Sequence, residues 1–219
     1  MHPARIAELL EPFLGTADDQ RLTANDLQDI STYIDVLLRW NAHINLTAIR
    51  NQEEIATRHF GESLFAARHL FPARLCRRER PRSCSLIDVG SGAGFPGLPI
   101  KIWAPDIDLT LIESNQKKAT FLREVTRKLT LTDVNVFPGR AADYPNTPAE
   151  TVTLRAVERF DAAVPIAAHL VAPAGRLALL IGQAQLARSR ELASNFAWKF
   201  AIPVPLSANR VLAIGIRET

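Results

Sequence analysis

Apolar residues recur at helical spacing through the first third of the chain. One run is formed by Leu27, Ile30, Ile34, Leu37 and Leu38. Thr23 is a candidate N-cap for this helix, with Asp26 in its first turn. A second run lies between about Glu53 and Leu70 and ends at Pro72; it is formed by Ile55, Phe60, Leu64, Ala67 and Phe71. The segment 1–72 is therefore predicted to be helical.

From residue 86 onward the pattern changes, because short apolar runs alternate with helical stretches. The apolar runs cover residues 86–89, 109–112, 134–137, 152–154 and 177–181. The helical stretches cover residues 98–104, 117–129, 160–170 and 185–196. Strands that alternate with helices at this spacing form a parallel sheet with right-handed crossovers. We therefore predict a doubly wound α/β fold.

The last two extended segments break this rhythm. Residues 198–204 and 211–217 are joined by a connection too short for a crossover helix. They are predicted to pair antiparallel, as a hairpin at the edge of a mostly parallel sheet. The predicted organisation is an N-terminal helical extension over 1–72, a basic linker over 73–85 and an α/β domain over 86–219.

The predicted linker is rich in arginine. It contains Arg74, Arg77, Arg78, Arg80 and Arg82, and Pro81 excludes a continuous helix. A formal charge of +3 and a pI near 9.1 permit an RNA partner without requiring one. The linker is interpreted either as a strip that contacts RNA phosphates, with help from the helical extension, or as a solvated charged loop.

Composition bounds the remaining possibilities. With 47% apolar residues the chain can build a sizeable core. No stretch approaches the ~18 apolar residues of a membrane-spanning helix, and the first 14 residues contain no uninterrupted apolar signal region. We expect a cytoplasmic protein without membrane contact, acting as a monomer. Cys76 and Cys84 form no CxxC pair and have no histidines at ligand spacing, so free thiols and no metal site are expected.

The densest chemical signal follows the first predicted strand, where residues 86–97 read LIDVGSGAGFPG. Ligands of such sheets bind beyond the carboxyl ends of the strands, and glycine lets the backbone approach them closely. The arrangement suits an adenine nucleotide moiety. Glu113 ends the next predicted strand, about 20 residues after the loop, where its carboxylate can accept hydrogen bonds from ribose hydroxyls.

The loop alone does not decide the cofactor, because it also satisfies GxGxxG through Gly92, Gly94 and Gly97. A dinucleotide-dependent oxidoreductase therefore stays open. Asp88 favours S-adenosylmethionine instead, since a carboxylate there would meet an amino group and repel a pyrophosphate. Pro96 and Pro99 remove backbone N–H donors that a pyrophosphate would use. The closing antiparallel hairpin is also typical of methyltransferases.

Further motifs accompany the loop. They are Trp40-Asn41, Asn45-Leu46-Thr47, Arg58-His59, Leu111-Ile112-Glu113-Ser114 with Lys117-Lys118, Gly139-Arg140-Ala141 and Arg155-Ala156-Val157. With these motifs the chain resembles, from about residue 40 to 182, the bacterial 16S ribosomal RNA (guanine-N(7))-methyltransferase G family, also called glucose-inhibited division protein B. The resemblance implies a Rossmann-like methyltransferase domain over 86–219. It further implies methyl transfer from S-adenosylmethionine to guanine N(7) of 16S rRNA in the small ribosomal subunit.

The resemblance also implies roles for individual residues. The implied donor-binding residues are Asp88, Gly90, Gly92, Gly94, Phe95, Glu113, Ala141, Ala142 and Arg155. Glu113 would hold the ribose, and the two alanines would pass along the adenine. Arg155 would lie on the substrate side, where its forked guanidinium suits a phosphate or a guanine. Arg155 and His59 are the candidate catalytic residues, with His59 interpreted either as a base or as an orienting residue.

Two positions depart from the family pattern. Glu62-Ser63 stands where the family usually has aspartate and serine, which is a conservative change. Ile181-Gly182 stands where the family commonly has lysine and glycine, so a cation expected near the site is missing. Ile181 therefore lends weight to a third hypothesis, a donor-binding module without turnover. Guanine N7 has a lone pair and no proton to lose, so its methylation would depend mainly on positioning.

Overall fold

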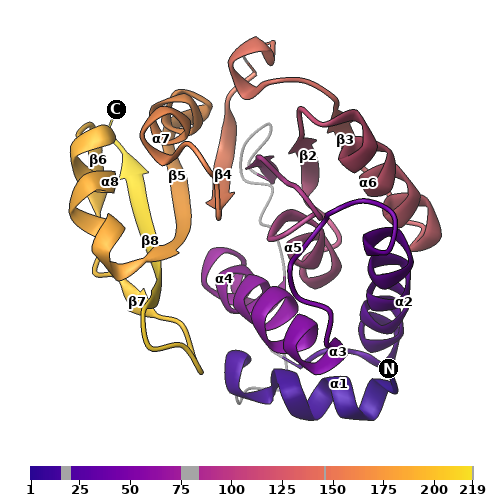
Figure 1. The fold of residues 1–219 in the computed structure, drawn as a ribbon. Helices are drawn as coiled ribbons and strands as arrows, with labels where there is room; N and C mark the ends of the chain where they lie inside the picture. The colour runs from indigo at the N-terminus through magenta and orange to yellow at the C-terminus, as the bar shows by residue number, and fades with distance from the viewer. Residues whose placement is uncertain (16–20, 75–83, 146, 219) are drawn as a thin grey trace.

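The computed structural model describes residues 1–15, 21–74, 84–145 and 147–218. One mixed β-sheet forms the middle layer, with helices packed on both of its faces (Figure 1). The strands are β1 (Ser85–Val89), β2 (Asp108–Ile112), β3 (Val134–Phe137), β4 (Ala149–Arg155), β5 (Val171–Gly182), β6 (Phe196–Trp198), β7 (Ile202–Pro203) and β8 (Arg210–Arg217). The α-helices are α1 (Pro3–Leu10), α2 (Ala24–Asn41), α3 (Gln52–Glu54), α4 (Glu62–Leu70), α5 (Gly97–Trp103), α6 (Gln116–Lys128), α7 (Phe160–His169) and α8 (Leu186–Leu192).

The strand order confirms the predicted fold class. Strands β1 to β5 pair in parallel in the order β3-β2-β1-β4-β5. Strand β8 runs antiparallel to β5, and its other side pairs with the short strands β6 and β7. The predicted antiparallel hairpin is therefore present, with β6 and β7 forming the outer edge of the sheet.

Side chains of each strand alternate between two apolar layers, as a pleated strand buried on both faces requires. Leu86 of β1 belongs to the layer shared with α1, α2, α4, α5 and α6. Its neighbour Ile87 belongs to the layer shared with α7 and α8. On β4, Leu154 packs in this second layer, so Arg155 projects toward the N-terminal helices. The polar residues discussed below thus lie on the face that those helices cover.

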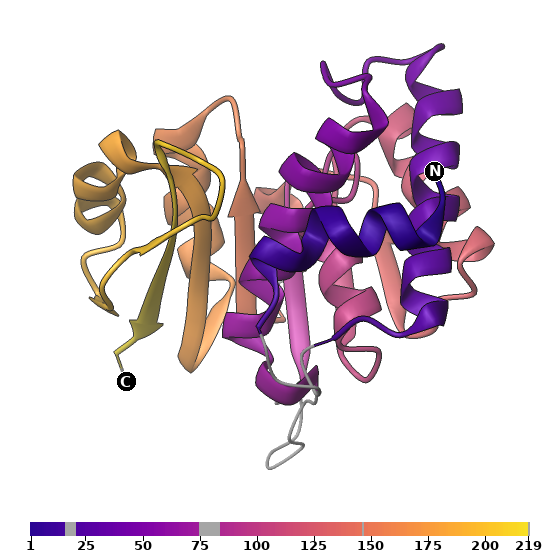
Figure 2. The ribbon, with the colours of Figure 1, turned by 90° about the horizontal axis from the view of Figure 1, so that it is seen from below.

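The N-terminal helices are part of the main core. Figure 2 shows α1 crossing in front of the sheet, with the other N-terminal helices beside it. Ile34 of α2 and Leu86 of β1 are both fully buried in the same apolar cluster. The N-cap expected at Thr23 is present at the start of α2, where Asp26 completes a capping box with it. The boundary proposed at residue 72 therefore separates two kinds of secondary structure within one continuous core.

The second predicted helix contains a change of winding. The segment from Gln52 to Leu70 is helical, but its middle, η3 (Ile55–Gly61), is a π-helix between α3 and α4. Ile55 and Phe60 are five residues apart and both fully buried. In a π-helix each backbone hydrogen bond joins residues that are five positions apart, and such helices are often found at functional sites. The wider turn brings Arg58 and His59 toward the end of β4.

Two expectations about residues 73–85 are affected by the structure. Arg74 pairs with Asp26 at 2.6 Å and stacks on the Trp103 ring, so it is a structural residue. The other linker arginines lie outside the described residues. Cys84 is disulfide-bonded, so the expectation of a free thiol there is wrong. That expectation rested on the lack of a CxxC pair and of histidines at ligand spacing, and such local spacing does not reveal a disulfide bond; Cys76 lies outside the described residues.

No helix within the described ranges is both long enough and apolar enough to cross a membrane.

Candidate functional site

The candidate site lies at the point where the order of the parallel strands reverses. Strand β1 pairs with β2 on one side and with β4 on the other, so the connections leaving β1 and β4 run in opposite directions along the sheet. A crevice forms at the carboxyl ends of strands at such a switch point. The glycine loop after β1, Glu113 after β2 and Arg155 at the end of β4 all fall at this edge.

The glycines of the loop meet two different requirements. Gly90, Gly92 and Gly94 all have left-handed backbone angles, with φ of +69°, +56° and +86°. A β-carbon on Gly94 would lie 2.2 Å from the Tyr33 hydroxyl, so this glycine is needed for close packing. A β-carbon on Gly92 would meet nothing closer than a backbone oxygen at 3.8 Å. The backbone at Gly92 is therefore open on the side where a ligand can approach.

Glu113 connects the end of β2 to this open part of the loop. One carboxylate oxygen accepts the backbone N–H of Gly92 at 2.8 Å, and the other accepts the N–H of Asn115 at 2.7 Å. The residue is only 7% exposed, so its orientation is fixed by its surroundings. Each carboxylate oxygen can accept more than one hydrogen bond. The pair of oxygens therefore remains able to accept two ribose hydroxyls.

Asp88 lies beneath the loop. Its carboxylate accepts hydrogen bonds from the backbone N–H of Gly97 at 3.2 Å and from the Thr153 hydroxyl at 2.8 Å. Burial raises the pKa of Asp88 to about 6, against the opposing effect of these hydrogen bonds. At 1% exposure the carboxylate supports the loop from inside. A direct contact between Asp88 and the amino group of a donor stays a prediction.

Phe95 links the loop to the N-terminal helices. Its ring stacks on Tyr33 with 5.4 Å between centroids and on His59 with 4.7 Å. The Arg155 guanidinium lies 5.9 Å from the centre of the same ring. The side chain is thus held among aromatic and cationic groups on the helical side of the loop. Its predicted role in lining a donor pocket stays a prediction.

Arg155 is the centre of a buried polar cluster, which we call the Arg155 cluster and define as Arg155, His59, Glu62 and Arg210. The Nη2 group of Arg155 lies within hydrogen-bond distance of Glu62 Oε2 at 3.1 Å, the Arg58 carbonyl at 2.8 Å and His59 Nδ1 at 3.2 Å. The Nε of Arg210 lies 3.1 Å from the same Glu62 oxygen. One carboxylate therefore serves two arginines, and the cluster keeps an excess of positive charge.

Two buried donors of the cluster, the Nε groups of Arg155 and Arg210, have no hydrogen-bond partner among the described residues. The Arg155 side chain is 8% exposed. Burial lowers the pKa of the Arg155 guanidinium, while Glu62 opposes this effect. A buried N–H without an acceptor costs free energy, so this part of the cluster is unfavourable for stability.

His59 is held in its neutral form. Burial and the neighbouring Arg155, Arg58 and Arg210 lower the pKa of His59 to about 3. Because arginine only donates, Nδ1 of His59 is the acceptor in its contact with Arg155, which corresponds to the tautomer with the proton on Nε2. The Nε2–H donates to the Thr47 hydroxyl at 2.8 Å. These contacts favour an orienting role for His59 over that of a base.

Sequence motifs without an assigned role explain how Thr47 is placed. The Asn41 side chain accepts the backbone N–H groups of Leu46 and Thr47 and donates to the Thr47 carbonyl at 2.9 Å. This closes the loop after α2 and fixes the hydroxyl that receives His59. These residues are family marks in the sequence, but nothing in the sequence connects them to Arg155. Arg210 and Tyr33 lie far from the loop along the chain and were not predicted as site residues.

The structure places the remaining predicted positions at different points. Ala141 and Ala142 lie in the short 3-10 helix η5 (Ala141–Asp143), which follows β3 at the same edge of the sheet. Ile181 is 3% exposed and packs in the layer with α7 and α8. It therefore lies on the opposite face of the sheet from Arg155. A lysine at this position would not join the Arg155 cluster, so Ile181 does not by itself argue against turnover.

The sheet order, with the glycine loop and Glu113 at its switch point, defines the class of protein, a doubly wound α/β fold of the methyltransferase type. Two solved structures that share it have TM-scores of 0.57. They are the YcgJ protein from Bacillus subtilis, with 13% identity over 74% of this chain and 100% of that one, and the ribosomal protein L11 methylase from Lactobacillus delbrueckii subsp. bulgaricus, with 12% identity over 74% and 79%. At these identities the similarity establishes the fold alone.

A family model described as rRNA small subunit methyltransferase G (GidB) matches residues 26–209, and the chain belongs to this family. The curated protein of that name from Leuconostoc mesenteroides is 34% identical over 168 residues, which cover 74% of this chain and 68% of the relative. The one from Alkaliphilus metalliredigens is 43% identical over 119 residues, or 54% of this chain. This match spans 46% of the relative's own length. The family suggested by the sequence motifs is thus confirmed.

Proposed function

We propose that the protein transfers a methyl group from S-adenosylmethionine to N7 of a guanine in 16S rRNA of the small ribosomal subunit. The observation that carries the proposal is the contact between Glu113 and Gly92. It joins a carboxylate able to hold a ribose to a glycine whose open side admits a ligand. The family match supports the same donor and the same class of acceptor.

The residues at the sheet edge fit the donor. Gly90 and Gly92 offer backbone without side chains, and Glu113 offers two carboxylate oxygens to the ribose hydroxyls. Ala141 and Ala142 offer small side chains beside which an adenine can lie. A bound donor supplies an electrophilic methyl group on a sulfonium. Asp88 supports the loop from below and adds negative charge near this cationic group.

The reaction at guanine N7 requires orientation more than proton transfer. The acceptor nitrogen has a lone pair and no proton to lose, so a residue of the chain need not act as a base. This agrees with His59, whose pKa of about 3 leaves it a weak base. His59 and Glu62 instead fix the Arg155 guanidinium, whose forked shape suits a guanine or a phosphate oxygen. Holding both reactants in line can contribute ~7 to 11 kcal/mol to the acceleration.

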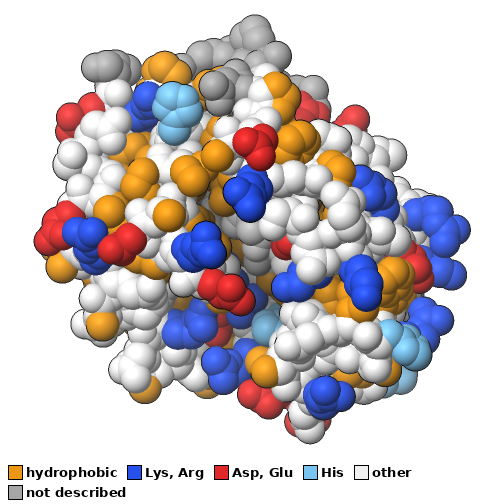
Figure 3. All heavy atoms as spheres, turned by 45° about the horizontal axis from the view of Figure 1, so that its top comes forward, with side chains coloured by type: hydrophobic (Ala, Val, Ile, Leu, Met, Phe, Trp, Pro, Cys, Tyr) orange, Lys and Arg blue, Asp and Glu red, His pale blue; other side chains and the backbone are white. Residues whose placement is uncertain are grey.

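The substrate is RNA, yet the charge of the protein is modest and dispersed. On the face shown in Figure 3, Lys and Arg side chains are interspersed with Asp and Glu side chains. RNA recognition is therefore expected to use local groups such as the Arg155 cluster and exposed bases, in addition to general attraction. On this proposal the protein works in the cytoplasm, where small subunits are made, and acts as a monomer.

One experiment tests the donor, the acceptor and the product together. Purified protein is incubated with labelled S-adenosylmethionine and small subunits that lack the modification, and the nucleosides are analysed by mass spectrometry. We expect one labelled 7-methylguanosine in 16S rRNA. Calorimetry with S-adenosylmethionine and with nicotinamide dinucleotides tests the oxidoreductase alternative, which requires binding of the dinucleotide. Donor binding without any transfer to the particles would favour the donor-binding module instead.

A further inference from the structure

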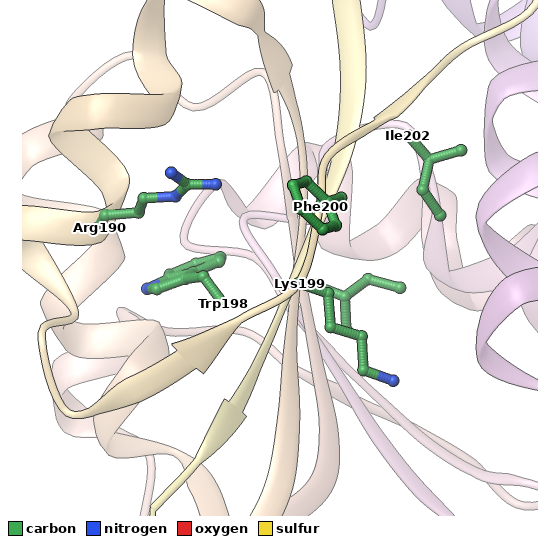
Figure 4. Close-up of a pocket in the computed structure, with 6 residues that line it drawn as sticks. Arg190, Trp198, Lys199, Phe200 and Ile202 are labelled. Atoms are coloured by element: carbon green, nitrogen blue, oxygen red, sulfur yellow. The ribbon is translucent and has the colours of Figure 1, made fainter.

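A surface pocket, distinct from the candidate site, lies at the outer edge of the sheet, beyond β8. A pocket of about 680 Å³ opens there, lined by Arg190, Trp198, Lys199, Phe200, Ile202 and Ile214. Figure 4 shows Phe200 standing between Arg190 and Trp198 on one side and Lys199 and Ile202 on the other. None of these residues takes part in the Arg155 cluster or the glycine loop. The pocket is therefore separate from the proposed site of methyl transfer.

Phe200 is exposed to an unusual degree. Its side chain is 95% accessible, the highest value among the exposed large hydrophobic residues of the described chain. Folding therefore gains almost nothing from burying this ring. The backbone that carries it is nevertheless fixed, because the N–H of Lys199 donates to the Ile214 carbonyl at 3.0 Å. The protein thus presents an aromatic ring to its surroundings from a well-held position.

Trp198 provides a second aromatic ring in the same pocket. Its indole N–H donates to the Ala193 carbonyl at 3.1 Å, which fixes the orientation of the ring. A β-carbon on Gly215 would approach this ring to 3.1 Å, so the indole lies directly on the β8 backbone. Rigid aromatic rings contribute large contact areas at a small entropic cost. The two rings are suited to receive a flat partner.

The polar groups of the pocket are cationic. Arg190 and Lys199 are exposed, and neither forms an ion pair among the described residues. No carboxylate lines the pocket within the described part of the chain. Aromatic rings flanked by arginine and lysine are the arrangement that binds unpaired bases, with the rings stacking on bases and the cations on backbone phosphates.

We propose that this edge pocket binds an unpaired base of the RNA substrate, with the adjoining phosphates contacting Arg190 and Lys199. The inference rests on the proposed function, because it assumes that the substrate is RNA. Strand β4, which carries Arg155, and strand β6 are three positions apart in the sheet, which corresponds to ~14 Å at the usual strand spacing. A folded RNA that reaches from the Arg155 cluster to this pocket is held at two points. The second contact fixes the direction in which the RNA crosses the sheet edge.

The test uses a short single-stranded oligoribonucleotide that carries the fluorescent adenine analogue 2-aminopurine, whose emission falls when it stacks. We expect the wild-type protein to quench the probe. Phe200→Ala should weaken binding about fivefold or more, and Phe200→Tyr should retain most of the affinity, because any aromatic ring can stack. Lys199→Ala should reduce the slope of log affinity against log salt by about 0.7, the value for one phosphate of a single strand.

Controls separate this inference from the proposed function. Lys128→Ala removes an exposed lysine at the end of α6 and should leave both affinity and salt slope nearly unchanged. S-adenosylmethionine affinity, measured by calorimetry, should be the same in all variants. Unaltered quenching in Phe200→Ala, with donor binding and methyl transfer intact, overturns the inference and leaves the proposed function standing. A wild-type protein that fails to bind the donor overturns the proposed function, whatever the probe shows.

A second copy of this chain is the other candidate occupant of the pocket. Sedimentation analysis of the wild type and of Phe200→Ala distinguishes it. A dimer that Phe200→Ala dissociates would show that the pocket is an interface between copies, and the inference about RNA would then be wrong. We expect monomers in both cases.

Discussion

The Tyr33 hydroxyl occupies the space that a side chain at position 94 would need, since a β-carbon on Gly94 would lie only 2.2 Å from it. The same hydroxyl donates to the Ala93 carbonyl. A residue of the N-terminal helix α2 therefore holds the glycine loop in place. The loop and the helical layer form one unit, and its parts can be tested separately.

The first test compares two glycines of the loop. Gly94→Ala should lower the free energy of unfolding by at least ~2 kcal/mol, because the left-handed backbone and the contact with Tyr33 both oppose a side chain. Gly92→Ala should cost only ~1 to 2 kcal/mol, since its side is open and the backbone angle alone is unfavourable. Chemical denaturation measures both. Equal losses would contradict the packing argument.

Glu113 provides the test of donor binding. Glu113→Ala removes the carboxylate that would accept the ribose hydroxyls and that holds Gly92, so S-adenosylmethionine should bind at least about tenfold more weakly. Glu113→Gln keeps the size of the side chain and one acceptor oxygen. Its affinity for S-adenosylmethionine should therefore lie between that of the wild type and that of Glu113→Ala. Calorimetry measures the affinity, and circular dichroism confirms the fold. Unchanged affinity in Glu113→Ala would remove this residue from the site.

Asp88 predicts a pH-dependent effect on stability. Its pKa of about 6 in the folded protein lies above the usual value of 3.8, so the folded state holds the proton more tightly. The stability that this residue contributes is therefore present at low pH and is lost as pH rises through about 6. Asp88→Asn should then be more stable than the wild type at pH 8, by up to a few kcal/mol, with a smaller difference near pH 4. Thermal unfolding across this range checks the sign.

His59 should remain neutral over the whole range in which a free histidine titrates. Its folded pKa of about 3 lies below the usual 6.5, so its contribution to stability is complete above about pH 6.5 and is lost as pH falls toward 3. Nitrogen-15 NMR of the imidazole should show a neutral ring from pH 8 to pH 5, with the proton on Nε2. A midpoint near pH 6.5 would mean that Arg155 does not bind Nδ1 and would reopen the role of a base.

Glu62 is expected to be important for stability because it balances two arginines. Glu62→Ala leaves Arg155 and Arg210 without their shared carboxylate in a buried position and should cost ~3 kcal/mol or more. Glu54→Ala is the matched control. Its ion pair with Arg58 is about half exposed and should contribute less than ~1 kcal/mol. Similar losses in the two variants would show that the buried pair has no special importance.

The strands and helices of the α/β part could be predicted because buried and exposed residues alternate with clear periods. The apolar run at 86–89 corresponds to β1 (Ser85–Val89) almost residue for residue. Strand β5 (Val171–Gly182) was predicted only over 177–181. Pro173 and Gly175 interrupt the apolar pattern there, and the pairing with β4 is irregular between Ala149 and Thr151. The local pattern of apolar residues therefore could not predict the first half of a strand whose pairing is irregular.

The chemistry of the site was predictable only in part. Glu113 and the glycine loop lie next to each other because they follow neighbouring parallel strands. The spacing of strands and helices in the sequence predicts that arrangement. Arg155 and Glu62 are 93 residues apart, and their contact depends on how α4 packs over the sheet. The π-helix left no local signal, because Ala56 and Phe60 are both fully buried and lie four residues apart, as in a regular α-helix.

The shared apolar cluster has a consequence for how this polypeptide can be divided. Helices α2 and α4, which precede Pro72, pack on α5, α6 and β5 of the α/β part within the same apolar cluster. A fragment that starts at β1 would therefore expose a large apolar surface to solvent. It would also lack Tyr33, whose hydroxyl contacts the glycine loop. We expect such a fragment to aggregate. We also expect the helical segment and the sheet to be kept together in evolution, because neither part is stable without the other.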